Sequence, residues 1–291
     1  MSKIKANYYY VPICPESFAT LDRLTIFFSN IAEQVEFESI NIAKRDYNHL
    51  SVSGEESEFL KSLSSNELSL SYGKLFMNNT MINGFPPSSS QIEKILRELS
   101  IDANYKLIET HYNLSSNKEL VNFREMKTVQ TNAKNCYDHC KICTKYSRYI
   151  DDENYLNVDW GKYESKKVKN LLNSISDDEL IGYLEYSNDT PVGMIEGYSS
   201  QMASKYGFPV TGNTNSCMIT CLHIRQEAEG HGIAKKLINS FLAAAKEKGF
   251  ETVEVVAYPG ITKWQPIDLY KKMNFMEIKK VGKLSIMVYK L

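Results

Sequence analysis

Apolar and polar residues alternate with two different periods over the first hundred residues. Runs in which every second position is apolar predict strands, and runs with apolar residues three and four positions apart predict helices. In order, the expected elements are strand 6–11, helix 17–33, strand 35–42, helix 55–64, strands 74–77 and 80–83, and helix 91–99. This order predicts a small α/β unit at the start of the chain.

Asn78 and Asn79 join the two short strands of this unit. Asparagine tolerates positive φ angles, so a two-residue connection of this kind predicts a β-hairpin. The order of elements, with Cys14 between the first strand and the first helix, resembles the thioredoxin-like modules attached to some bacterial acetyltransferases. Pro15 and a helix start favour a thiolate at Cys14, but Ser17 stands in place of a resolving cysteine. The resemblance therefore implies a scaffold or substrate-presenting module, with redox activity of Cys14 as an open alternative.

Beyond residue 102 the pattern predicts a larger unit that is richer in strands. The expected elements are strand 104–111, helix 115–123, strands 180–186, 192–198 and 217–224, helix 232–248, strand 252–257, helix 266–273, and a pair of strands within 276–289. A chain of 291 residues exceeds the usual size of one domain. We therefore expect two domains, at 1–102 and 103–291.

A turn with two glycines follows the apolar strand 217–224 and precedes a helix. Gly230 and Gly232 lack Cβ atoms where the backbone must approach a ligand, and a helix start directs free N–H groups and a positive dipole end outward. The helix carries an apolar residue at every fourth position, at Ile233, Leu237, Phe241 and Ala245. A diphosphate group would be held at this turn by main-chain donors.

This succession of parts resembles the GNAT superfamily of acetyltransferases, whose coenzyme loop reads Gln/Arg-x-x-Gly-x-Gly/Ala. Residues 229–234 read Glu-Gly-His-Gly-Ile-Ala, with Glu229 where the family usually has Gln or Arg. Residues 269–275 resemble a late segment of the family, with Asn274 in place of glycine. The resemblance covers about residues 104–291. It implies an α/β (α+β) fold with a mixed, mostly antiparallel central sheet flanked by helices.

The resemblance also implies an acetyl-CoA-dependent N-acetyltransferase that acts on a primary amine by direct attack in a ternary complex. Backbone donors of the fourth strand would polarise the carbonyl group. Tyr270 matches the tyrosine that protonates the leaving thiolate, with packing under the sheet as the alternative. His223 is the candidate base, and Glu196 and Glu254 are further acids on strands. The residues expected to bind acetyl-CoA are Leu222, His223, Ile224, Glu229, Gly230, His231, Gly232, Ile233, Ala234 and Lys235.

Three cysteines, Cys136, Cys140 and Cys143, have the spacing of a radical-SAM cluster loop. Residues 144–291 do not supply the repeated strand–helix units of the barrel that such enzymes need. A zinc site that adds His139 or His111 is the stronger alternative. A single Cys-x2-Cys pair without a partner pair is usually free of metal, so we expect no metal.

The charge balance limits the range of partners. With 34 basic and 35 acidic residues the net charge is -1, which disfavours binding to nucleic acid or an anionic membrane. Six cysteines are too few for a disulfide framework, and no signal segment is found, so we expect a cytoplasmic protein. The expected partner is a small-molecule amine or a peptide amine, and a homodimer is left open. The alternatives are a non-catalytic sensor of acyl-CoA or of a thiol, and a thiol oxidoreductase that uses Cys14.

Overall fold

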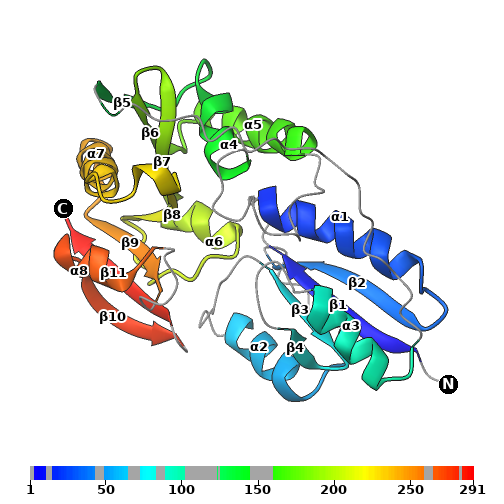
Figure 1. Ribbon diagram of the computed structural model, residues 1–291. Helices are drawn as coiled ribbons and strands as arrows, with labels where there is room; N and C mark the ends of the chain where they lie inside the picture. Colours follow the sequence, from blue (N-terminus) through cyan, green and yellow to red (C-terminus); the bar gives the residue numbers. More distant parts are fainter. Residues whose placement is uncertain are drawn as a thin grey trace.

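The structure, a computed structural model, describes residues 3–10, 15–42, 49–64, 73–82, 89–101, 123, 125–144, 160–258, 265–281 and 284–291. Within these ranges the chain forms two α/β units, each built on a sheet of its own (Figure 1). The predicted strand 104–111 and nearly all of the predicted helix 115–123 lie outside the described residues. Cys14 and His111 also lie outside them.

The first unit contains its elements in the predicted order. They are β1 (Ile4–Tyr10), α1 (Pro15–Ser29), β2 (Val35–Asn41), α2 (Gly54–Ser64), β3 (Lys74–Met77), β4 (Thr80–Ile82) and α3 (Ser89–Glu98). The strand order is β2-β1-β3-β4, with β1 parallel to β2 and antiparallel to β3. Asn78 and Asn79 have φ angles of 46° and 66°, so the predicted hairpin is confirmed. Helix α1 ends earlier than predicted, because the amides of Asn30 and Ile31 bond to carbonyls three residues back and turn the chain toward β2.

Neighbouring tyrosines of β1 face opposite layers of the molecule, as the twofold repeat of a strand requires. Tyr8 packs in the core that α1 and α3 form against one face of the sheet. Tyr9 packs in a second core that is shared with the C-terminal unit. The members of this shared core are Tyr9, Ile40, Ile42, Leu60, Phe76, Ala203, Phe208, Met218, Val256, Tyr258 and Leu284. The two units are therefore joined by buried apolar surface.

The second unit is built on a seven-stranded sheet with the order β10-β11-β9-β8-β7-β6-β5. Its elements are β5 (Met126–Gln130), α4 (Cys136–Thr144), α5 (Trp160–Ser176), β6 (Ile181–Ser187), β7 (Thr190–Ser199), α6 (Ser200–Lys205), β8 (Ser216–Ile224), the 3₁₀ turn η2 (Gln226–Ala228), α7 (Ile233–Glu247), β9 (Thr252–Ala257), α8 (Ile267–Lys272), β10 (Met276–Val281) and β11 (Leu284–Lys290). Within the described residues, β8 and β9 run parallel and the other neighbours are antiparallel. The predicted mixed, mostly antiparallel sheet is confirmed.

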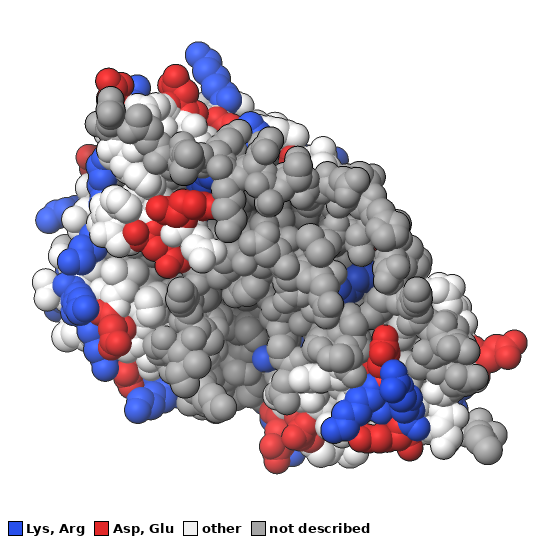
Figure 2. Space-filling view, in the orientation of Figure 1, with Lys and Arg blue, Asp and Glu red and all other residues white. Residues whose placement is uncertain are grey.

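Helices cover both faces of this sheet. Helix α7 lies on one side of β6, β7 and β8, and α4 and α5 lie on the other side (Figure 1). The residues of α7 that were predicted to face the core are all buried. On the described part of the face in Figure 2, acidic and basic side chains are interspersed. None of the helices in the described ranges combines the length and the apolar character that a membrane crossing requires.

Candidate functional site

The two parallel strands of the second sheet, β8 and β9, separate from each other before they end. Strands β8 and β9 pair from Ser216 and Thr252 as far as Ile219 and Val255. Strand β8 nevertheless continues to Ile224 and β9 to Ala257. The C-terminal half of β8 therefore has a main-chain edge that β9 does not cover, and this edge borders an opening between the strands.

The glycine turn lies beside this opening and leads into α7. Gly230 and Gly232 have φ angles of 83° and 77°, a left-handed conformation that favours glycine. A Cβ atom built on either residue would meet no atom within 4 Å. The lack of side chains therefore leaves open space in front of the backbone.

The first amides of α7 are available to a ligand. Gly232 is the N-cap of the helix and provides no side-chain cap, and the first helical bond runs from the amide of Lys236 to the carbonyl of Gly232. Among the described residues, no acceptor lies within bonding distance of the amides of Gly232, Ile233 and Ala234. Unpaired donors at the positive end of a helix dipole favour an anion.

A cavity of about 570 Å³ joins the open edge of β8 to the glycine turn. Its walls are mostly apolar, with polar groups at Glu229, Lys235 and Gln265. The lining residues are Leu222, Ile224, Ala228, Glu229, Gly230, Gly232, Ile233, Ala234, Lys235, Gln265, Pro266 and Leu269. Sequence reasoning missed Ala228, Gln265, Pro266 and Leu269.

Two of the residues predicted to bind coenzyme do not line this cavity. His231 is exposed, donates from Nδ1 to the carbonyl of Glu229 at 3.0 Å, and stacks on Phe123 with ring centroids 4.2 Å apart. His223 is buried and lies opposite Met194 of β7, on the sheet face that α4 covers. In this structure neither imidazole lies among the lining residues of the cavity.

Tyr270 lies close to the cavity but does not line it. The side chain is fully buried in α8, and its hydroxyl donates to Oε1 of Gln265 at 2.9 Å. Burial raises the pKa of Tyr270 well above its ordinary value, and the nearby Cys221 raises it further. The phenol therefore stays protonated at neutral pH.

One family model matches the part of the chain that carries the glycine turn and its neighbouring strands. Residues 145–275 match the model of a family described as the acetyltransferase (GNAT) family. This segment is a GNAT acetyltransferase domain. It includes β6 to β9, the glycine turn, α7 and α8.

Several solved structures resemble the chain, all at low sequence identity. The paia N-acetyltransferase of Thermoplasma acidophilum, in complex with coenzyme A, is 17% identical, with 57% of this chain and 99% of that chain covered and a TM-score of 0.43. An acetyltransferase of Thermus thermophilus is 16% identical, with 58% of this chain and 99% of that chain covered and a TM-score of 0.41. An N-acetyltransferase of Staphylococcus aureus is 16% identical, with coverages of 57% and 98% and a TM-score of 0.41. No curated protein sequence matches the chain.

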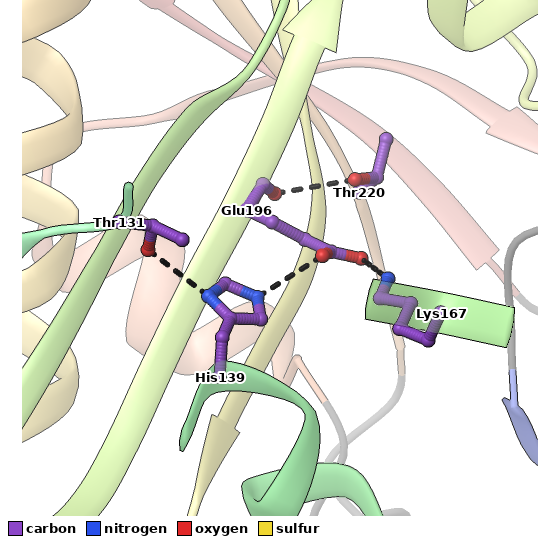
Figure 3. Close-up of polar contacts among 5 residues, drawn as sticks. All are labelled: Thr131, His139, Lys167, Glu196 and Thr220. Atoms are coloured by element: carbon purple, nitrogen blue, oxygen red, sulfur yellow. Dashed lines mark hydrogen bonds and ion pairs between the residues drawn. The ribbon is translucent and has the colours of Figure 1, made fainter. Parts of the chain in front are cut away.

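A buried charged network lies on the face of the seven-stranded sheet that α4 and α5 cover (Figure 3). Glu196 of β7 accepts bonds from Nζ of Lys167 at 2.6 Å and from Nε2 of His139 at 3.0 Å. Nδ1 of His139 lies 3.0 Å from the hydroxyl of Thr131. The side chains of the three titratable residues are at most 4% exposed. The network joins α4 and α5 to the centre of the sheet.

The protonation states in this network follow from burial and from the neighbouring charges. Burial alone would raise the pKa of Glu196, but the charge of Lys167 and the bond from His139 lower it to about 2. Burial lowers the pKa of His139 despite Glu196, so its imidazole is neutral and donates from Nε2. The network is therefore an ion pair with a neutral donor, and Glu196 is too weak a base to accept a proton from an amine.

Glu254, the other acid named from the sequence, is also engaged. Its carboxylate accepts bonds from the amide and the hydroxyl of Thr211 at 2.8 and 2.6 Å, and from Ser216 at 2.8 Å. These bonds hold the loop before β8 against β9. The contacts give Glu254 a structural role.

The cysteine cluster forms part of α4, and its members are buried free thiols. Both ring nitrogens of His139, the proposed fourth zinc ligand, are engaged by Thr131 and Glu196. In the part of the chain that the structure describes, no group of three His, Cys, Asp or Glu side chains is arranged to hold a metal ion. These contacts argue against the zinc site with His139.

Proposed function

We propose that this protein is an acetyl-CoA-dependent N-acyltransferase that transfers an acetyl group to a primary amine by direct attack in a ternary complex. The observation that carries the proposal is the row of unpaired amides at Gly232, Ile233 and Ala234, beside the parted strands of a GNAT domain. The acyl-CoA thioester would supply an activated acyl group.

The residues of the cavity fit such a donor. The amides of the glycine turn would hold the diphosphate, and the ammonium group of Lys235 lies in the same first turn of α7. Leu222, Ile224 and Leu269 offer apolar walls to the pantetheine arm. Glu229 adds a negative charge close to the amides, which would weaken phosphate binding.

The open edge of β8 would orient the thioester. Main-chain N–H groups between Leu222 and Ile224 would polarise its carbonyl, and the lack of pairing between β9 and this stretch supports this role. Tyr270 is the family's candidate for protonating the leaving thiolate, and its raised pKa keeps that proton in place. The side chain of His223 lies on the opposite face, so the structure gives no support for a base role within the cavity.

We further propose that the first unit is a thioredoxin-like module that shapes access of the amine. Its βαβ start, its hairpin and the order β2-β1-β3-β4 support the fold assignment. It packs on the sheet face opposite α7, through the shared core around Tyr9 and Val256. The reduced, buried cysteines among the described residues support a reducing, cytoplasmic location.

One observation favours a non-catalytic acyl-CoA sensor as the second candidate. Tyr270 is fully buried and its hydroxyl is bonded to Gln265, so it does not contact the cavity directly. A sensor would bind acetyl-CoA and release no free CoA with any amine.

Calorimetric titration with acetyl-CoA tests the proposal, with Gly232→Ala as the key variant. A methyl group there would occupy the open space in front of the amides, and we expect at least about tenfold weaker binding. Gly249→Ala is the matched control, because Gly249 follows the other end of α7 with a φ of 82° and equally open surroundings. Equal affinities of the two variants, or no binding by the wild type, would refute the proposed site. Free CoA, measured by chromatography over a panel of amines, then separates the enzyme from the sensor.

A further inference from the structure

Gln265 occupies an unusual position at the wall of the cavity. It is 4% exposed and has a φ of 39°, in the left-handed region that residues other than glycine rarely adopt. Its carbonyl accepts a bond from the amide of Tyr258 at 3.0 Å, and Pro266 forms a bridge with the same residue. Tyr258, the residue that follows β9, thus holds the backbone of Gln265 and Pro266 in place. A strained residue that the surrounding fold holds in place is a candidate for function.

The side chain of Gln265 is held at one end and available at the other. Its Oε1 accepts the hydroxyl of Tyr270 at 2.9 Å. Its Nε2 has no acceptor among the residues that the structure describes. The fully buried polar atoms that lack a partner do not include this nitrogen. A side-chain amide has two N–H donors on this nitrogen. Because Gln265 is also one of the residues that line the cavity, its side-chain nitrogen is a candidate donor at this wall.

Tyr270 itself has no direct contact with the cavity. Its side chain is fully enclosed, its ring packs on that of Phe275 in a T-shaped arrangement with centroids 5.2 Å apart, and it is absent from the cavity lining. The hydroxyl proton is directed at Oε1 of Gln265. The hydrogen bond of this phenol therefore connects it to the cavity through Gln265.

We infer that Gln265 is the side chain that contacts the acyl-coenzyme at this wall, donating from Nε2 to a carbonyl oxygen of its arm, and that Tyr270 is a positioning residue acting through it. The inference rests on the proposed function. It gives Gln265 the side-chain contact with the coenzyme arm and places Tyr270 behind it, whereas the resemblance gave Tyr270 the protonation of the leaving thiolate. The remaining walls near Gln265 are apolar, at Leu222, Pro266 and Leu269. A carbonyl oxygen that leaves water for such a wall needs a donor to replace its lost hydrogen bond.

The test compares acetyl-CoA binding by three variants with that of the wild type at about pH 7.5. Gln265→Met keeps the length of the side chain and removes both polar ends. Gln265→Glu keeps an acceptor for Tyr270 but loses the N–H donors, and Tyr270→Phe removes only the hydroxyl. We expect about fivefold to tenfold weaker binding for the two Gln265 variants and about twofold weaker binding for Tyr270→Phe. Circular dichroism confirms that each variant is folded.

A pH series and a second ligand make the test specific. A protonated glutamic acid can donate from its hydroxyl, so Gln265→Glu should regain affinity as the pH falls from about 7.5 to about 5, whereas Gln265→Met should not. Titration with free CoA tells which carbonyl is bound: a defect confined to acetyl-CoA indicates the thioester, and a defect with both ligands indicates an amide of the pantetheine arm.

Two results would overturn the inference while leaving the proposed coenzyme site in place. One is wild-type affinity in Gln265→Glu at neutral pH, and the other is a larger defect in Tyr270→Phe than in Gln265→Met. Absence of binding by the wild type would overturn both proposals together.

Discussion

The buried pair of Lys167 and Glu196 gives the largest stability effect that we expect from a single polar substitution. Lys167→Met removes the ammonium group from a carboxylate that is 3% exposed. In the wild type His139 is a neutral donor and carries no charge that balances Glu196. We expect the variant to lose roughly 3–5 kcal/mol of unfolding free energy, because breaking a buried pair leaves one charge desolvated.

The pKa of Glu196 shows how the stability contributed by its charged form depends on pH. Its value falls from 4.5 to about 2 on folding. A shift of this size corresponds to about 3 kcal/mol in favour of the folded state. Because the folded pKa is depressed, this stability is present above pH 4.5 and is lost as the pH falls toward about 2. Lys167 has a raised pKa, so its contribution is present below its ordinary value of 10.5 and is lost only above that pH.

Urea unfolding followed by circular dichroism measures both effects. Lys162→Met is the matched control, because Lys162 lies on the same helix and pairs with Asp22, yet its side chain is 65% exposed. An exposed pair of this kind contributes roughly 0–1 kcal/mol. Combining Lys167→Met with Glu196→Gln should restore part of the loss, since no charge is then left buried. A Lys167→Met variant that is no more destabilised than Lys162→Met would contradict the expected cost of a buried unpaired charge, and so would a double variant that is less stable than Lys167→Met.

Two further substitutions have directions that the structure determines. Glu229→Gln removes a negative charge from the cavity wall next to the α7 amides, so calorimetry should show about twofold to fivefold tighter binding of acetyl-CoA. This gain in affinity should shrink in high salt. Unchanged affinity would mean that the Glu229 carboxylate lies away from the phosphates. Gly197→Ala would place a Cβ 2.1 Å from the carbonyl oxygen of Met218 and 2.6 Å from the ring of Phe241. It should cost roughly 1–3 kcal/mol or more of unfolding free energy, while Gly193→Ala, whose nearest neighbours are side-chain carbons, should cost less.

The local parts of the fold could be predicted from the sequence. Asn78 and Asn79 predict a hairpin because a two-residue turn needs positive φ angles at both positions. The fourfold spacing from Ile233 to Ala245 predicts the buried face of α7, and Gly232 predicts an uncovered helix start. Each of these signals depends only on residues that are close in sequence.

The polar contacts between distant segments could not be predicted in this way. Glu196 meets Lys167 29 positions earlier and His139 57 positions earlier, and no local pattern indicates this meeting. Gln265 precedes a proline in a loop, and its importance depends on Tyr258 and Tyr270. The spacing of Cys136, Cys140 and Cys143 also matches the turn of a helix, so packing of α4 explains it without a metal.

A shift in strand register explains why His223 faces away from the cavity. Cys217 and Ile219 point to α7, and strict alternation would place Cys221 and His223 on that face as well. The pairing of β7 with β8 shifts between Glu196 and Gly197, so that Thr220 is an extra residue on β8. One extra residue exchanges the faces of every residue after it, which turns Leu222 and Ile224 toward the cavity.

Glu196 holds this bulge from two sides. Its carbonyl accepts the hydroxyl of Thr220 at 3.2 Å, and its carboxylate is held by Lys167 and His139 (Figure 3). An apolar residue in place of Glu196 could fill the same volume at a lower desolvation cost, but it would not link α4 and α5 to the bulged strand pair. The buried ion pair is thus placed where a change of register would remove Leu222 and Ile224 from the wall of the cavity beside the glycine turn.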